Sequence, residues 1–204
     1  MPNTQDIVVV DIDGTVADCC ERKFKSLHDS GVHILETEDF FVDSHLTPEQ
    51  LKTFLSIFLS NKYIHLDEPV PYAAEVLQRL EKSGKRIVYL TARHDSDSED
   101  SMRWGTIQWL KRYNFPLDTD HLFMKIDKGE SNRECKEREM REISGLGNVY
   151  AGIGDMREDA DVYLKFTSNC VLLTTFHPES EYEGLDKRVK LVDDWQQIGR
   201  YLGV

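Results

Sequence analysis

A short run of β-branched residues, Ile7–Val10, leads directly into Asp11-Ile12-Asp13-Gly14-Thr15 near the start of the chain. Such a run is typical of a strand that is buried on both faces in a parallel sheet. Its carboxyl end carries two carboxylates at the edge where open α/β sheets bind their ligands. The glycine allows a tight turn there, and the threonine supplies a hydroxyl. The pattern indicates either a reactive pair of acids or a simple Asp-Gly turn.

Four further apolar runs follow, and each one ends in polar or glycine-containing sequence. They are Ile87–Leu90, Leu122–Met124, Val149–Ile153 and Val171–Leu173. Helical patterns fall between the runs, at Tyr72–Glu81, Trp104–Leu110 and, more weakly, Cys135–Ile143. Strands that alternate with helices in this way predict an α/β fold, with a Rossmann-like parallel sheet covered by helices on both faces.

The alternation stops between residues 19 and 68, where no buried strand is predicted. Helices are predicted at Glu21–Ser30 and at Leu51–Leu59, the second after a Thr-Pro start signal. We therefore expect a core of residues 1–18 plus 69–204, with residues 19–68 inserted after the first strand as a helical cap. Such an insertion either lies over the site as a lid or packs away from it.

Composition excludes several classes of protein. The chain has 204 residues, which suits one domain with a modest insertion, and its net charge of -12 argues against broad binding to nucleic acid or to anionic membranes. No run approaches the roughly 18 apolar residues of a membrane span, and the first residues lack a secretory signal, so we expect a cytoplasmic protein. The four cysteines show no zinc-like spacing and are expected to be free thiols. Arg22, Lys23 and Lys25 form either a solvated helix face or a local phosphate contact.

Polar residues also follow two of the later apolar runs. Thr91-Ala92-Arg93 offers a hydroxyl, backbone N–H groups and a guanidinium to phosphate oxygens. Gly154-Asp155 is followed by Asp159. In isolation this segment suits a loop and a helix cap, but its acids can also complete an oxygen-rich Mg²⁺ site with Asp11 and the backbone carbonyl of Asp13.

These motifs, in this order, resemble those of the haloacid dehalogenase superfamily of phosphotransferases. D-x-D-G-T matches the first motif at Asp11–Thr15, Thr91 matches the second, and G-D-x-x-x-D matches the fourth at Gly154–Asp159. Phosphatases of the family use an acid at the position of Asp13, whereas its dehalogenases lack one. The resemblance therefore implies a phosphatase.

The third motif of the family is a lysine. Lys125, Lys128 and Lys136 all lie in the right interval, and Lys136 is preferred because it falls on the helix before the fourth motif.

The resemblance also implies a role for each matched residue. Asp11 is expected to attack phosphorus and Asp13 to move the proton, while Thr91 and Lys136 stabilise the phosphate oxygens. Asp159 is expected to orient the lysine or the metal. The expected ligands of Mg²⁺ are Asp11, Asp155 and the carbonyl of Asp13.

A narrower likeness concerns the phosphatase domain of polynucleotide kinase-phosphatases. Thr91–Arg93, Thr106–Leu110 and Leu122–Lys125 resemble S/T-G-R, T-x-x-W-L and L-x-M-R, with Ala92 in place of glycine and Lys125 in place of arginine. The expected substrate is a small phosphorylated metabolite or nucleotide, or a 3′-phosphorylated nucleic-acid end. Transfer to another acceptor, as in a phosphomutase, and a non-catalytic binding role stay open as alternatives.

Overall fold

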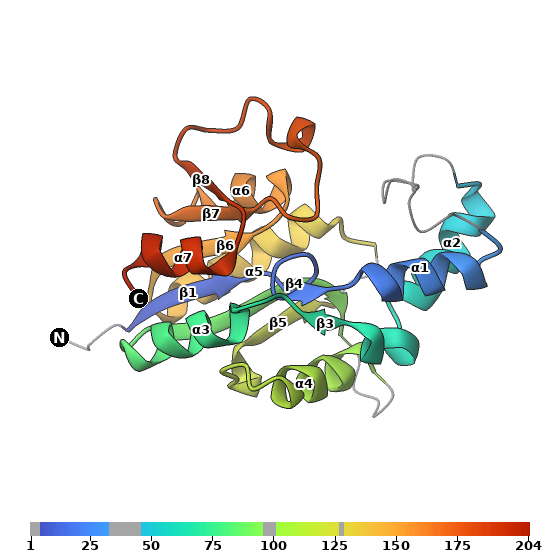
Figure 1. The fold of residues 1–204 in the computed structure, drawn as a ribbon, viewed down its shortest axis with the longest axis horizontal. Coiled ribbons are helices and arrows are strands. Elements are labelled where there is room, and N and C mark those ends of the chain that lie inside the picture. The colour runs from blue at the N-terminus through green and yellow to red at the C-terminus, as the bar shows by residue number, and fades with distance from the viewer. Residues whose placement is uncertain (1–4, 33–45, 96–100, 127–128) are drawn as a thin grey trace.

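The structure is a computed structural model that describes residues 5–32, 46–95, 101–126 and 129–204. Its centre is a six-stranded sheet in the order β5-β4-β1-β6-β7-β8 (Figure 1). All of the strand pairs in this sheet are parallel. The strands are β1 (Asp6–Val10), β4 (Arg86–His94), β5 (Leu122–Lys125), β6 (Asn148–Gly154), β7 (Cys170–Leu173) and β8 (Val189–Val192).

Helices cover both faces of this sheet, as the alternation of patterns predicts. Residues 7–10 of β1 are fully buried: Val8 and Val10 belong to one hydrophobic core, while Ile7 and Val9 belong to the other. The first core is closed by α3 (Ala73–Lys82), α4 (Met102–Arg112) and α7 (Trp195–Leu202). The second is closed by α5 (Asn132–Leu146) and α6 (Arg157–Tyr163). The α/β class is thereby confirmed. No helix in the described ranges combines the length and hydropathy needed to cross a bilayer.

The last strand and helix, β8 and α7, go beyond the sequence prediction. The side chain of Asp194 accepts a hydrogen bond from the Gln197 backbone N–H at 2.7 Å and so caps α7. Trp195 follows it and is fully buried. Its indole nitrogen donates to the backbone oxygen of Thr15 at 2.8 Å, so α7 supports the loop that follows β1.

The inserted segment contains α1 (Cys20–Asp29), α2 (Pro48–Phe58) and the 3-10 helix η2 (Asn61–Leu66). It leaves and re-enters the sheet region through two short antiparallel strands, β2 (Ala17–Asp18) and β3 (Glu68–Pro69). In Figure 1, α1 and α2 lie to the right, on the side toward which β1 runs. The remaining 3-10 turns are η3 (Thr119–His121) and η4 (Glu179–Tyr182). A cap of residues 19–68 stays a prediction, since residues 33–45 lie outside the described ranges.

Candidate active site

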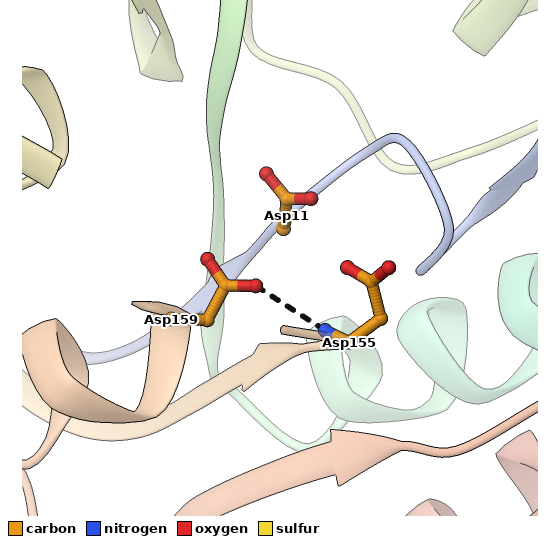
Figure 2. Close-up of side chains that lie close together, drawn as sticks. All are labelled: Asp11, Asp155 and Asp159. Carbon is orange, nitrogen blue, oxygen red and sulfur yellow. Dashed lines mark hydrogen bonds between the residues drawn. The ribbon is translucent and has the colours of Figure 1, made fainter. Parts of the chain in front are cut away.

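Three buried carboxylates meet at the carboxyl edge of the sheet. Asp11 directly follows β1, Asp155 directly follows β6, and Asp159 lies in the first turn of α6. One ligand atom from each lies within 4.8 Å of the others, and Figure 2 shows the three side chains gathered around a common space. The parallel register explains this meeting, because β1 and β6 are neighbours and end at the same edge.

Contacts on both oxygens fix the carboxylate of Asp155. The hydroxyl of Thr15 donates to Oδ1 at 3.1 Å, and Nε2 of His177 lies 2.6 Å from Oδ2. The carboxylate also presses against the backbone of Gly14, which has a φ of +75°. A Cβ at this glycine would lie 2.0 Å from Asp155 Oδ2, so the D-x-D-G-T turn needs glycine both for its conformation and for space.

Lys136 places its ammonium among these acids. It lies on α5 with only 7% of its surface exposed, and its Nζ donates to Asp11 Oδ1 at 2.9 Å and to Asp159 Oδ1. Burial alone would lower the pKa of Lys136, but Asp11 and Asp159 outweigh it and raise the pKa well above its usual value. Lys136 is therefore charged. Of the other two candidate lysines, Lys125 lines the same cavity, and Lys128 lies outside the described residues.

Asp159 serves the backbone as well as the lysine. Its Oδ2 accepts from the backbone N–H groups of Asp155 at 3.3 Å and Met156 at 3.1 Å. A Cβ on Gly154 would lie 2.5 Å from that same oxygen. Asp159 thus holds the turn between β6 and α6 and positions Lys136 at the same time.

The charges of this cluster fit a divalent cation. Burial raises the pKa of Asp11 well above its usual value, with Lys136 opposing the shift and the other two acids adding to it. Burial likewise raises the pKa of Asp155, and the contact with His177 opposes that rise. Three carboxylates thus compete for one lysine in a buried space. Oxygen donors of this kind suit a hard cation such as Mg²⁺ or Mn²⁺.

The side chain of Asp13 points into a second charged cluster. Its Oδ1 accepts from Arg93 Nη2 at 2.6 Å and from Arg22 Nη2, and its Oδ2 accepts from Arg93 Nε at 3.0 Å. Both arginines also pair with Asp67, at 2.7 Å from Arg93 and 2.8 Å from Arg22. Two guanidiniums and two carboxylates therefore alternate, and Arg22, Arg93 and Asp67 are buried.

Two expectations are corrected by this cluster. Arg93 was expected to bind substrate phosphate, but its donors are directed at Asp13, Asp67 and the hydroxyl of Thr106, the last at 3.1 Å. Arg22 was expected on a solvated face or at a phosphate, but it is fully buried. Both corrections have one cause, because a buried guanidinium requires carboxylates, and Asp13 and Asp67 supply them.

The two acids of this cluster titrate differently. Burial would raise the pKa of Asp13, but Arg22 and Arg93 outweigh it and hold the pKa well below its usual value. Asp67 is completely buried, and burial raises its pKa to about 6 although the same arginines oppose the shift. Asp13, whose side chain keeps 25% of its surface exposed, therefore stays ionised to lower pH than Asp67 does.

A cavity of about 780 Å³ opens onto both clusters. Thr91 and Ala92 belong to its wall, and Thr91 Oγ1 accepts from the Arg93 backbone N–H at 3.2 Å. The inserted segment supplies an apolar part of the wall through Phe54, Leu55, Phe58 and Leu59.

Sequence reasoning missed His177 and Asp67. His177 follows β7 by four positions, so a search of every strand end for polar residues would have found it. Asp67 has no comparable signal, because its partners are distant in the sequence.

Comparison with known proteins agrees with this architecture. No family model matches the chain. A curated protein named "Putative nucleotidase" from Bacillus cereus is 31% identical over 121 residues, which are 55% of this chain and 61% of that protein. A predicted phosphatase from Clostridium acetobutylicum superposes with a TM-score of 0.70 at 16% identity, covering 98% of this chain and 99% of that one. A haloacid dehalogenase-like hydrolase from Streptococcus pneumoniae superposes with a TM-score of 0.65 at 13% identity, covering 98% and 100% of the two chains.

The chain has the haloacid dehalogenase-like fold. The alignment spans less than two thirds of the Bacillus cereus protein, and the structural neighbours fall well below 25% identity. The comparisons thus define the architecture in which Asp11, Lys136 and Asp155 meet, and the chemistry follows from the residues themselves.

Gly14→Ala is expected to destabilise the protein by more than its backbone conformation accounts for. Gly84→Ala is the matched control, because Gly84 also has a positive φ, +92°, but a Cβ there meets nothing within 4 Å. The control should lose about 1–2 kcal/mol of unfolding free energy. Gly14→Ala should lose roughly a further 1–3 kcal/mol, because the new Cβ collides with Asp155. Urea denaturation measures both values, and equal losses would contradict the proposed close packing.

Arg22→Met is expected to lower the unfolding free energy by about 3–5 kcal/mol, because it leaves the buried Asp67 and the partly exposed Asp13 with one guanidinium. Lys25→Met on the same helix is the control. The side chain of Lys25 is 45% exposed and lies 3.6 Å from Asp29, so its loss should cost less than about 0.5 kcal/mol. Chemical denaturation of both variants at pH 7 tests the difference, and similar stabilities would argue against a buried cluster.

Proposed function

We propose that this chain is a Mg²⁺-dependent phosphomonoester hydrolase that acts through an aspartyl-phosphate on Asp11. The observation that carries the proposal is the position of Asp11, which lines a cavity and lies close to a buried ammonium and two further carboxylates. A nucleophilic carboxylate, a fixed cation and an acidic metal cluster are the parts that phosphoryl transfer needs.

Asp11, Asp155 and the backbone carbonyl of Asp13 would hold a divalent cation, and this cation would neutralise charge on the phosphate oxygens. The chain's own residues supply the rest. Asp11 attacks phosphorus in line and forms the acyl phosphate while the P–O bond to the leaving group breaks. Lys136 and the hydroxyl of Thr91, both buried, stabilise the charge on the transferring oxygens. Water then attacks phosphorus, which releases phosphate and restores the Asp11 carboxylate.

Asp13 moves the proton in this scheme. Arg22 and Arg93 lower its pKa, so the carboxylate is the form present in this arrangement, and it suits the base that accepts a proton from the attacking water. To give a proton to the leaving oxygen in the first step, Asp13 must start that step protonated, which requires that substrate binding loosen one of the two ion pairs. The proton that Asp13 accepts from the attacking water in the second step restores this form for the next turnover. The arginines therefore act as positioning residues that hold Asp13 toward the reacting phosphate.

The apolar part of the cavity wall supports a nucleotide as the substrate class. Phe54 and Phe58 stack on each other with their ring centroids 5.4 Å apart, and both line the cavity. Aromatic surface of this kind suits a flat, apolar leaving group such as a nucleoside. The match to a protein named as a nucleotidase agrees with this class, and the net charge of -12 favours a small molecule over a nucleic-acid polymer.

Asp11→Asn is expected to lower kcat by about a thousandfold or more while the fold is retained, because an amide cannot attack phosphorus. Release of phosphate from p-nitrophenyl phosphate and from nucleoside monophosphates, with Mg²⁺ present, measures the effect. Asp120→Asn is the control, since Asp120 is exposed and lies away from the cavity. Full phosphatase activity in Asp11→Asn would overturn the scheme, and absence of any activity in the native protein would favour a binding role.

His177→Leu is expected to weaken Mn²⁺ or Mg²⁺ binding by about 10- to 100-fold, because the imidazole fixes the carboxylate of Asp155. His177→Gln keeps a donor and should recover part of the affinity. His65→Leu is the control, because His65 is exposed and does not line the cavity. Isothermal titration with the metal alone gives the affinities. Unchanged binding in His177→Leu would show that Asp155 does not depend on this contact.

A further inference from the structure

A second cationic position lies in the wall of the cavity, apart from the acidic cluster. Lys125 is the last residue of β5, and Asn132 is the first residue of α5. Both line the cavity, and Lys125 Nζ donates to Asn132 Oδ1 at 3.2 Å. The mechanism proposed above uses neither of them.

Lys125 is buried without the compensation that its counterpart Lys136 has. Each lysine has only 7% of its surface exposed. Lys136 pairs with two carboxylates, whereas within the described ranges Lys125 makes one hydrogen bond to a neutral amide and no ion pair. The nearby carboxylate of Glu134 is exposed, accepts hydrogen bonds from Ser131 and acts on Lys125 only at longer range. An ammonium group has three N–H donors, and burying it without a counter-charge is costly. The ammonium of Lys125 is therefore suited to bind an anionic group of a ligand in the cavity.

The sheet sets the separation between this position and Asp11. In the sheet order, β5 pairs with β4, and β4 pairs with β1, so Lys125 at the end of β5 and Asp11 just after β1 belong to strands that lie two spacings apart. Two spacings correspond to about 10 Å between backbones. The long side chain of Lys125 shortens the gap that a ligand must bridge. A small molecule can therefore reach both positions at once.

We propose that Lys125 and Asn132 form a second anion subsite, so that the preferred substrates are phosphomonoesters carrying another phosphate or carboxylate group on the same small molecule. The proposal rests on the proposed function, because it takes Asp11 as the position of the phosphate that is hydrolysed. The ammonium of Lys125 pairs with the second anion, and the amide of Asn132 holds the ammonium in place. The reacting phosphate has its own cation in Lys136, so the two lysines serve different groups of one ligand.

Substrates that differ only in the second anion test this subsite. One set compares adenosine 3′,5′-bisphosphate with adenosine 3′-phosphate and adenosine 5′-phosphate. A second set compares 3-phosphoglycerate with glycerol 3-phosphate, which separates a carboxylate from a phosphate preference. The readout is the ratio of kcat/KM between the members of a set. In at least one set, we expect a ratio of about 10 or more in favour of the member that carries two separate anionic groups.

Lys125→Met should lower that ratio by about tenfold or more, and Lys125→Arg should keep most of it, because the guanidinium retains the charge. Lys187→Met should leave it unchanged, since Lys187 is exposed and outside the cavity. A ratio that is near 1 in the native protein, or that Lys125→Met leaves unaltered, would overturn the subsite.

Binding separates failure of the subsite from failure of the proposed function. The Asp11→Asn protein can be titrated calorimetrically with the same ligands, and this measurement needs no turnover. Tighter binding of the doubly anionic ligand, lost in Asp11→Asn/Lys125→Met, supports the subsite even if no phosphate is released. Equal affinities for all members of each set would exclude it.

Discussion

The alternating ion pairs of Asp13, Arg22, Arg93 and Asp67 are the interaction on which the rest of this structure depends. Arg22 comes from α1 in the inserted segment, and Arg93 comes from β4 in the sheet. Each guanidinium contacts both carboxylates, so the desolvation of four charges is compensated from within the cluster. The inserted helices are thereby tied to the carboxyl edge of the sheet through the same acid that is proposed to move the proton.

The two charged clusters of the cavity differ in their balance. In the cluster of Asp13, Arg22, Arg93 and Asp67, two arginines neutralise two carboxylates. No further ion is needed there, which suits a structural role. In the second, one lysine faces Asp11, Asp155 and Asp159, so negative charge is left over. A buried excess of carboxylate oxygens is stable only if protons or a cation compensate it, and the raised pKa values of Asp11 and Asp155 express that demand. Chemistry is thus expected at the cluster with excess negative charge, around Asp11. The neutral cluster around Asp13 fixes the structure beside it.

The sequence predicted the sheet and the polar residues at its carboxyl edge because those features have local signals. Runs such as Ile7–Val10 mark buried strands, and the polar residues that follow them must meet at one edge. The pairing of Asp13 with Arg22 had no such signal, because a basic residue on a helix looks the same whether it faces water or a buried acid. Asp67 lies 54 positions from Asp13, and only the folded chain brings the two together. The α7 helix differs from these residues, because it has local signals in its Asp194 cap and in the apolar spacing of Trp195 and Ile198, although no helix was predicted there.

The cavity wall around the proposed position of the phosphate is not chemically uniform. The two sides of the cavity wall contributed by α2 and by β5 have opposite character, since Phe54 and Phe58 are aromatic and Lys125 is cationic. A ligand fixed at Asp11 by its phosphate therefore gains little by turning its apolar portion toward Lys125 or a second anion toward the aromatic rings. The energetic penalty for the wrong orientation is larger than for a uniformly apolar pocket, because it leaves a buried ammonium without an anion. In the proposed scheme, catalysis and selectivity depend on different residues: the cluster around Asp11 is proposed to carry the phosphoryl chemistry, and the chemical contrast within the wall is proposed to select the ester.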